Sequence, residues 1–192
     1  FSLHCLSLVV LIFSMMGVVV ADGGYTFLFY WELMTIASFL LILFDAQKPE
    51  VTRAALSYLV MMHIGFLFLV GGFVKLWMET GSADFAALGQ YYREGQIIPL
   101  FLIFLAGFGM KAGLFPMHVW LPEAHPAAPS HVSAIMSGVM IKTGIYGLLR
   151  ITAPIEGETL YTVGLILLGA GIVTGLWGVI LAATQNDVKR LM

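Results

Sequence analysis

Charge is scarce in this sequence, and so is cysteine. Only 10% of its 192 residues are Asp, Glu, Lys or Arg, whereas a soluble domain carries about 25%. The single cysteine, Cys5, excludes a disulfide framework and any zinc or iron–sulfur site held by thiolates within the chain. The formal net charge of −2 shows no excess of one sign that would indicate a nucleic-acid partner. Because 60% of the residues are hydrophobic, we expect an integral membrane protein that lies in a lipid bilayer and holds no cofactor or metal.

Six apolar segments are long enough to cross a bilayer, which takes about 20 residues. They cover residues 2–21, 25–44, 54–77, 96–125, 130–149 and 160–184. The longest polar connection lies between the third and fourth segments. Aromatic residues near the segment ends are suited to the membrane–water interface, namely Trp77, Tyr91, Tyr92, Trp120 and Tyr161. The sequence therefore predicts an all-α fold, a polytopic transmembrane helical bundle.

The basic residues of the connections bear on the orientation of this bundle. With six spans the connections alternate sides, which places Lys48, Arg53, Lys189 and Arg190 on one side and Lys75, Arg93 and Arg150 on the other. Because lysine and arginine concentrate in cytoplasmic loops, the excess of one residue favours the first group as cytoplasmic.

The fourth segment is too rich in proline and glycine to form one continuous helix. Prolines stand at positions 116, 122 and 126, and glycines at 107, 109 and 113. Proline removes a backbone donor and interrupts a helix, and backbone groups freed at membrane depth are satisfied by neighbouring protein or water. We therefore predict a discontinuous helix with a hydrated break. His118 and His125 flank the break, and His125 is either part of a hydrated cavity or an ordinary loop histidine.

Two lysines, Lys111 and Lys142, lie inside apolar segments, in the fourth and the fifth. A charge near the middle of a span costs several kcal/mol, so such residues usually face an interior path and carry function. We expect both amines to be buried and to gain and lose a proton. The alternative is an amine that reaches the interface or holds a fixed ion pair. On an uninterrupted helix Lys142 shares a face with His131 and Tyr146, so protons could pass along that face through ordered water or a further partner.

Glu32 lies near the middle of the second segment, and His4 and His63 lie in the first and third. A carboxylate beside a lysine keeps that lysine charged, so Glu32 and a lysine form either a switch or a static pair. The two histidines are open to three interpretations: packing residues, members of a proton relay, or axial ligands of a haem.

Four stretches of the sequence, in this order, resemble parts of the antiporter-like subunits of respiratory complex I. Residues 29–34 are similar to the fifth helix of these subunits, and residues 109–125 to their broken seventh helix. Residues 139–150 are similar to the eighth helix, and residues 187–191 to the segment after the ninth. Residues 124–134 are most similar to the subfamily in group 4 membrane-bound nickel–iron hydrogenases, of the hydrogenase-4 and formate hydrogenlyase type.

The resemblance implies about fourteen helices, arranged as five-helix units repeated in inverted topology. On this basis we expect the chain to be an internal piece of a longer polypeptide. Residues 1–150 would form the first antiporter-like five-helix unit, and residues 151–192 the first helix of the second unit with the loop after it. The family also includes subunits of multisubunit sodium/proton antiporters.

The resemblance also implies roles for individual residues. Glu32 matches the glutamate that pairs with the lysine of the broken helix, Lys111. Lys142 matches the lysine that passes protons toward the central hydrophilic axis. The histidines predicted to assist are His125 and His131 as proton-transfer residues and His63 and His118 as accessory residues.

The function implied is that of a proton-translocating subunit in a complex-I-like membrane oxidoreductase linked to a hydrogenase. It would be a multi-pass protein of the prokaryotic inner (plasma) membrane, beside other membrane subunits and a peripheral redox arm. The ion is the proton, with sodium as the alternative in an antiporter subunit. A rival from another class is a cytochrome-b-like electron carrier with haem between His4 and His63.

Overall fold

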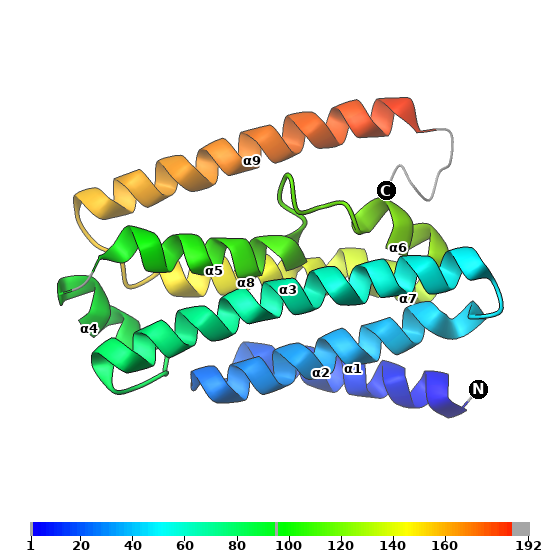
Figure 1. Cartoon of the computed structure of the whole chain (residues 1–192), viewed down its shortest axis with the longest axis horizontal. Helices are drawn as coiled ribbons and strands as arrows, with labels where there is room; N and C mark the ends of the chain where they lie inside the picture. Colours follow the sequence, from blue (N-terminus) through cyan, green and yellow to red (C-terminus); the bar gives the residue numbers. More distant parts are fainter. Residues whose placement is uncertain (1, 95, 186–192) are drawn as a thin grey trace.

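The computed structural model describes residues 2–94 and 96–185, and every regular element in them is a helix (Figure 1). Five stretches are long and apolar enough to cross a membrane: α1 (Ser2–Val20), α2 (Gly24–Ile42) with the 3₁₀ turn η1 (Leu43–Asp45), α3 (Pro49–Thr80), Ser130–Thr152, and α9 (Glu158–Thr184). A sixth apolar helix, α5 (Ile97–Ala112), is shorter because the chain breaks after it. The prediction of an all-α, multi-pass bundle is confirmed.

Helix α3 is longer at both ends than the predicted span of residues 54–77. It begins at Pro49, whose fixed φ and missing N–H suit the first helical position. It ends because Gly81 adopts the left-handed conformation, with a φ of 77°, and donates its N–H to the carbonyl of Trp77 at 2.8 Å. The prediction followed only the apolar run and therefore missed the polar turns on either side of it.

The predicted discontinuity in the fourth segment is confirmed. Helix α5 ends because Gly113 takes the left-handed conformation, with a φ of 72°. Residues 113–120 contain turns and no regular helix, and the short α6 (Leu121–Ala127) follows. Across the break, the indole Nε1 of Trp120 donates to the carbonyl of Met110 at 2.9 Å. The Trp120 side chain, which lies in the break, thus donates a hydrogen bond to a backbone carbonyl at the end of α5.

The polar connection after α3 contains a helix that the sequence did not predict, α4 (Ala87–Glu94). Its Tyr91 and Tyr92, predicted as interfacial anchors, are buried, and so is Trp120. The hydroxyl of Tyr92 donates to the carbonyl of Ile151 at 2.9 Å. Burial raises the pKa of this phenol, so the hydroxyl remains a donor. These aromatic residues join α4 and the break to the bundle instead of facing an interface.

The fifth predicted segment has three parts: α7 (Ser130–Ile135), the π-helical turn η2 (Met136–Met140) and α8 (Ile141–Thr152). A π turn holds one residue more than an α turn, so the side chains beyond it are rotated by about 100°, the angle of one residue. The predicted alignment of Lys142 with His131 assumed an uninterrupted α-helix and is wrong for this reason.

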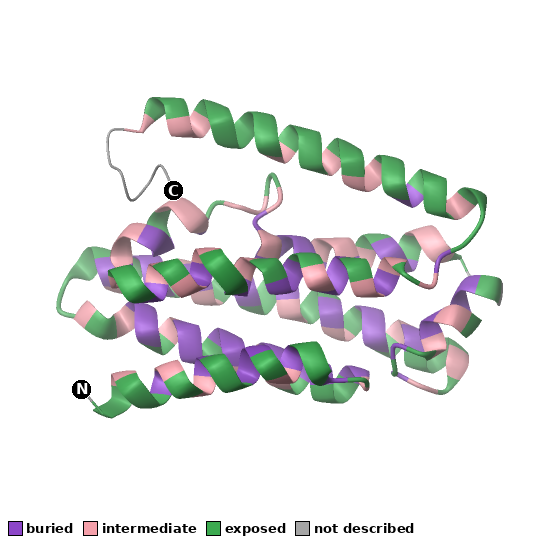
Figure 2. Ribbon diagram, turned by 180° about the vertical axis from the view of Figure 1, so that it is seen from behind, coloured by how far each residue is buried: buried purple, intermediate pink, exposed green. Residues whose placement is uncertain are grey.

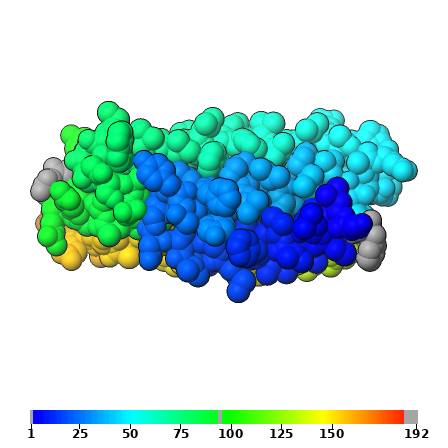
Figure 3. All heavy atoms as spheres, turned by 90° about the horizontal axis from the view of Figure 1, so that it is seen from below, coloured from blue at the N-terminus to red at the C-terminus, as the bar shows by residue number. Residues whose placement is uncertain are grey.

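The helices pack closely around α5. Helix α1 lies along α2, and α3 packs against both α2 and α5, while α8 also packs against α5. Figure 3 shows α1, α2 and α3 side by side on one face of the molecule. A Cβ on Gly107 of α5 would lie 2.9 Å from the carbonyl oxygen of Gly65 on α3, so both helices need glycine to approach this closely. The aromatic residues of the core include Phe27, Trp31, Phe73, Phe104 and Phe108.

Helix α9 lies apart from the other helices (Figures 1 and 2). Val163 is its single buried residue, and apolar side chains are exposed along its described length. The backbone N–H of Phe115 donates to Oγ1 of Thr174 at 3.0 Å, and the Phe115 ring lies 5.2 Å from that of Trp177. The close-packed bundle is therefore formed by α1 to α8. The motif predicted at residues 187–191, with its two basic residues, lies outside the described residues.

Candidate functional site

The amine of Lys111 lies in the interior of the bundle, and the prediction that this residue is buried is confirmed, because only 1% of it is exposed. Its Nζ donates to Oγ1 of Thr35 on α2 at 3.0 Å. It also lies over two aromatic rings, 5.4 Å from the centroid of Trp31 and 5.9 Å from that of Tyr58. Ring faces attract a cation at such distances. A neutral hydroxyl and two ring faces therefore surround this amine.

Two features of α5 hold the amine in this place. Lys111 lies in the last turn of the helix, where the helix dipole favours a positive charge. Left-handed Gly113 then ends the helix, and Trp120 from beyond the break binds the Met110 carbonyl. The break that the prolines and glycines impose thus lies directly beside the buried lysine.

Hydroxyl groups on α2 and α3 extend the polar region beyond this amine. The Thr35 hydroxyl donates to the carbonyl of Trp31 at 3.1 Å, and Oγ of Ser38 lies 2.5 Å from the hydroxyl of Tyr58. Thr35, Ser38 and Tyr58 are all fully buried. None of the three was predicted from the sequence as a site residue. The available signal was the spacing of Glu32, Thr35 and Ser38, which places three polar residues on one face of an apolar helix.

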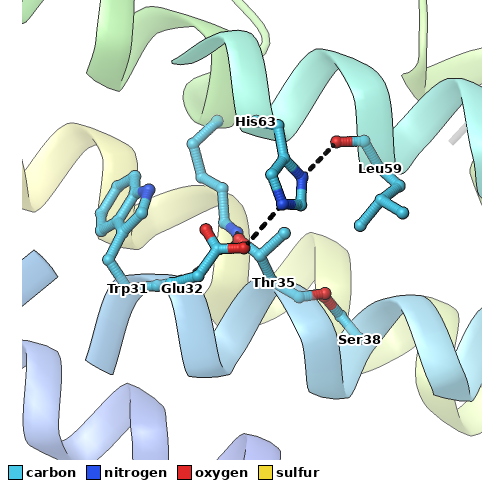
Figure 4. A network of polar contacts seen from close by, with 7 residues as sticks. Trp31, Glu32, Thr35, Ser38, Leu59 and His63 are labelled. Carbon is cyan, nitrogen blue, oxygen red and sulfur yellow. Dashed lines mark hydrogen bonds and ion pairs between the residues drawn. The ribbon is translucent and has the colours of Figure 1, made fainter. Parts of the chain in front are cut away.

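Among the described residues no ion pair joins Glu32 to Lys111, the residue with which the resemblance predicted it to pair. In the described part of the chain its Oε1 lies 3.0 Å from Nε2 of His63 on α3, while Nδ1 of that ring lies 2.9 Å from the carbonyl of Leu59 (Figure 4). The other carboxylate oxygen, Oε2, is buried and has no hydrogen-bond partner among the described atoms. The sequence named Glu32 and His63 separately, but no local pattern links a residue of the second span to one of the third.

Lys142 is exposed on the outside of the described bundle, so the prediction that it is buried is wrong within these residues. Its amine donates to the carbonyl of Ser137 in the π turn. The rotation at that turn accounts for the difference, because Thr143 and Gly144 occupy the buried positions instead. An apolar run shows that a segment spans the membrane but not which of its faces meets another helix.

Three further histidines of the predicted site lie in the break and in the two short helices after it. The residue His125 is 6% exposed, and its Nδ1 lies 2.9 Å from Oγ of Ser133. Nε2 of His131 lies 2.7 Å from Nε2 of His4 on α1. His118 has a buried Nδ1 without a partner among the described residues. Within those residues none of the three hydrogen-bonds to the buried amine or to the carboxylate of α2.

His4 and His63, the pair proposed to bind a haem, contact different partners in the described residues. Nε2 of His4 contacts His131, and Nε2 of His63 contacts Glu32. These are the nitrogens that would ligate the iron, and they are engaged in separate contacts. In residues 2–94 and 96–185, no group of three or more His, Cys, Asp or Glu side chains is placed to hold a metal ion.

An all-helical bundle with an interrupted span and ionisable groups inside it defines a class of multi-pass membrane protein, the class that includes transporters and proton pumps. Residues 21–192 match the family described as NADH:quinone oxidoreductase/Mrp antiporter, transmembrane. The chain belongs to this family, as the resemblance of its motifs predicted.

Two relatives illustrate the range of the family. The chain is 44% identical over 179 residues to an uncharacterised protein of Mycobacterium tuberculosis (strain ATCC 25618 / H37Rv), a match that covers 93% of this chain and 28% of that protein. It is 36% identical over 186 residues to hydrogenase-4 component B of Escherichia coli (strain K12), covering 95% and 28%. The chain thus spans less than a third of the length of these relatives.

Two solved structures share the fold. The membrane-bound sulfane sulfur reductase, described as an archaeal respiratory membrane complex, matches with a TM-score of 0.84 at 30% identity, covering 95% of this chain and 31% of the matched one. The Mrp complex from Dietzia sp. DQ12-45-1b matches with a TM-score of 0.85 at 27% identity, covering 95% and 20%. The first is thus described as a respiratory membrane complex and the second as an Mrp complex.

Proposed function

We propose that this chain is part of a proton-translocating membrane subunit of a complex-I-like oxidoreductase, of the hydrogenase-linked type. One observation carries the proposal. The amine of Lys111 is buried beside an interrupted span and contacts a neutral hydroxyl and two ring faces, with no carboxylate in contact among the described residues. An ammonium in such a place costs free energy that these neutral groups offset only in part. The amine therefore takes up a proton when a negative group approaches and gives it up when that group withdraws.

Glu32 is the residue that supplies this negative group. It lies one helical turn before Thr35, whose hydroxyl binds Lys111. Its carboxylate is partly buried and has one oxygen without a hydrogen-bond partner among the described atoms. A small change of side-chain conformation would move its charge between the contact with His63 and the neighbourhood of the amine.

The remaining predicted residues connect this centre to other parts of the protein. His125, His131 and His118 lie around the break and would carry protons between Lys111 and one membrane surface through water. Lys142, exposed on the described bundle, would exchange protons with a part of the protein outside it. This division agrees with the proposal that residues 1–150 are one antiporter-like unit and that residues 151–192 begin a second.

Two comparisons support the oxidoreductase assignment. The chain is 36% identical to hydrogenase-4 component B, and it shares its fold with a subunit of a respiratory membrane complex. In an assembly of this kind, other membrane subunits would lie beside the chain, and a peripheral redox arm would perform the electron transfer that drives proton movement.

The experiment is replacement of Lys111 by Met in the full-length protein within its complex. We expect Lys111→Met to abolish proton pumping while assembly and electron transfer persist, because the methionine side chain fills the space of the lysine stem but binds no proton. The control is Lys75→Met, which removes a partly exposed lysine that pairs with Glu79 at 2.6 Å. The measurement is proton uptake into vesicles per electron transferred. A Lys111→Met complex that pumps at the wild-type ratio would contradict the proposal.

Sodium/proton antiport is a second candidate function, favoured by the likeness to the Mrp complex. It predicts that vesicles holding the complex move protons in response to a sodium gradient with no electron donor present. The oxidoreductase proposal predicts proton movement only while electrons flow. A dye that reports internal pH distinguishes the two outcomes.

A further inference from the structure

The contact between His63 and Glu32 is defined by a third group, the carbonyl of Leu59. Nδ1 of His63 lies 2.9 Å from this carbonyl oxygen, one helical turn earlier on α3. A carbonyl only accepts hydrogen bonds, so Nδ1 carries a proton. The backbone of α3 therefore fixes which ring nitrogen of His63 is protonated in the neutral form.

The fixed tautomer places one proton between the ring and the carboxylate. In a neutral ring with Nδ1 protonated, Nε2 has a lone pair and no hydrogen, and an ionised carboxylate has none either. These two acceptors would repel each other at the observed Nε2–Oε1 distance of 3.0 Å. The contact therefore holds a proton, either as imidazolium and carboxylate or as imidazole and carboxylic acid. The pair of His63 and Glu32 has no net charge in either form.

This neutrality matters for Lys111, which needs a negative group nearby to hold its proton. When the contact loses its shared proton to an acceptor, imidazole and carboxylate remain, and the net charge becomes −1. The Glu32 carboxylate then favours the ammonium form of Lys111, which takes one proton from a donor. Return of a proton to the contact removes the negative charge, and the amine releases its own. One proton thus leaves one site as one enters the other.

The exposure of the three side chains gives this exchange a direction. The His63 side chain is 48% exposed on the described bundle and that of Glu32 is 20% exposed, whereas Lys111 is almost fully enclosed. His63 is therefore the member that can exchange a proton with groups outside these helices. The carboxylate lies between it and the interior, on the face of α2 that also carries Thr35.

We infer that His63 is a proton-holding residue of this site, which shares one proton with Glu32 and so decides when the carboxylate can act on Lys111. The inference rests on the proposed proton translocation and adds a residue and an order of events to it.

Two measurements on the full-length protein in its complex test the inference. The first is ¹⁵N NMR of the protein with ring-labelled histidine. The signals of His63 are identified as those that are present in the wild-type spectrum and absent from the spectrum of His63→Gln. We expect Nδ1 to be protonated throughout, and Nε2 to share its proton in the wild type but not in Glu32→Gln. In vesicles, His63→Gln should lower proton transport about a hundredfold, since an amide can donate to Glu32 but cannot take up or release a proton. The matched control, Leu67→Gln, places the same amide on the exposed face one turn later on α3 and should transport normally.

Each outcome has a distinct meaning. If His63→Gln and Glu32→Gln each slow transport and the double variant is no slower than the worse single variant, the two residues act as one unit. An unprotonated Nδ1, or a His63→Gln complex that transports like wild type while Lys111→Met does not, would overturn the inference and leave the proposed function intact. A wild-type complex that moves no protons would defeat the proposed function, and the NMR spectra would still decide whether the proton is shared.

Discussion

At the residue scale, the hydroxyl of Thr35 determines how Lys111 is held. It donates its single proton to the carbonyl of Trp31 at 3.1 Å, so toward Lys111 it can only accept. A lysine amine has N–H donors whether it is charged or neutral. The Thr35 contact therefore positions the amine in both protonation states without favouring either strongly, and the ring of Trp31, 5.4 Å away, adds attraction for the charged form.

Replacement of Thr35 by Val should show this positioning role. Valine keeps the shape of threonine and removes the hydroxyl, which leaves a buried amine without its hydrogen bond. We expect the protein to lose about 1–3 kcal/mol of stability and to transport protons more slowly. The control is Thr162→Val on α9, where an exposed hydroxyl bonds the carbonyl of Glu158. Thermal unfolding in detergent and vesicle transport provide the two measurements, and equal behaviour of the two variants would contradict the assignment.

At the scale of single helices, the approach of α8 to α5 depends on Gly144. A Cβ at this position would lie 2.7 Å from the backbone nitrogen of Ala112 and 2.8 Å from the carbonyl oxygen of Phe108. Backbone atoms cannot yield as a flexible side chain can, so the two helices would have to separate. This contact is one residue from Lys111, which makes the crossing of α5 and α8 part of the support for the buried amine.

Gly144→Ala should therefore destabilise the protein by about 1–3 kcal/mol, the usual cost of overpacking. The matched control is Gly164→Ala on α9, where an added Cβ meets nothing within 4 Å. In that helix interior, alanine should be neutral or stabilising by up to about 1 kcal/mol because of its helix propensity. Melting temperatures of the two variants in the same detergent would test the difference, and the same shift in both would refute the crossing argument.

Helices also show which parts of the structure the sequence could predict. The spans and the break followed from local rules, since apolar length predicts a span and the prolines with Gly113 predict an interruption. The π turn of residues 136–140 has no comparable local signature, and the exposure of Lys142 follows from it. The contact of Glu32 with His63 depends on how α2 and α3 pack, which the pattern within either helix does not specify.

At the scale of the whole molecule, Arg150 joins three parts of one end of the bundle. From α8, its guanidinium lies 3.2 Å from Oδ1 of Asp22 in the turn between α1 and α2, and it donates to the carbonyl of Ala21. It also lies 3.9 Å from the ring centroid of Phe85, just before α4. A planar guanidinium can make these contacts together, and an ammonium cannot.

Arg150→Lys should accordingly lower the melting temperature although the charge is kept. The control is Arg93→Lys on α4, an exposed arginine whose replacement should leave the melting temperature unchanged. If a lysine at position 150 supports the wild-type melting temperature, charge alone is sufficient there and the geometric argument fails.

The length of α3 locates the site in the membrane. Its 32 residues extend about 48 Å at 1.5 Å per residue, more than the hydrocarbon core of about 30 Å. Arg53 and Lys75 are separated by about 33 Å along it, so the two basic residues can lie at opposite headgroup levels with His63 close to the bilayer midplane. A proton that moves between His63 and either surface then crosses about half of the transmembrane voltage. Each such step exchanges about 1.2 kcal/mol per 100 mV with the membrane potential, so both halves of the path are electrically significant.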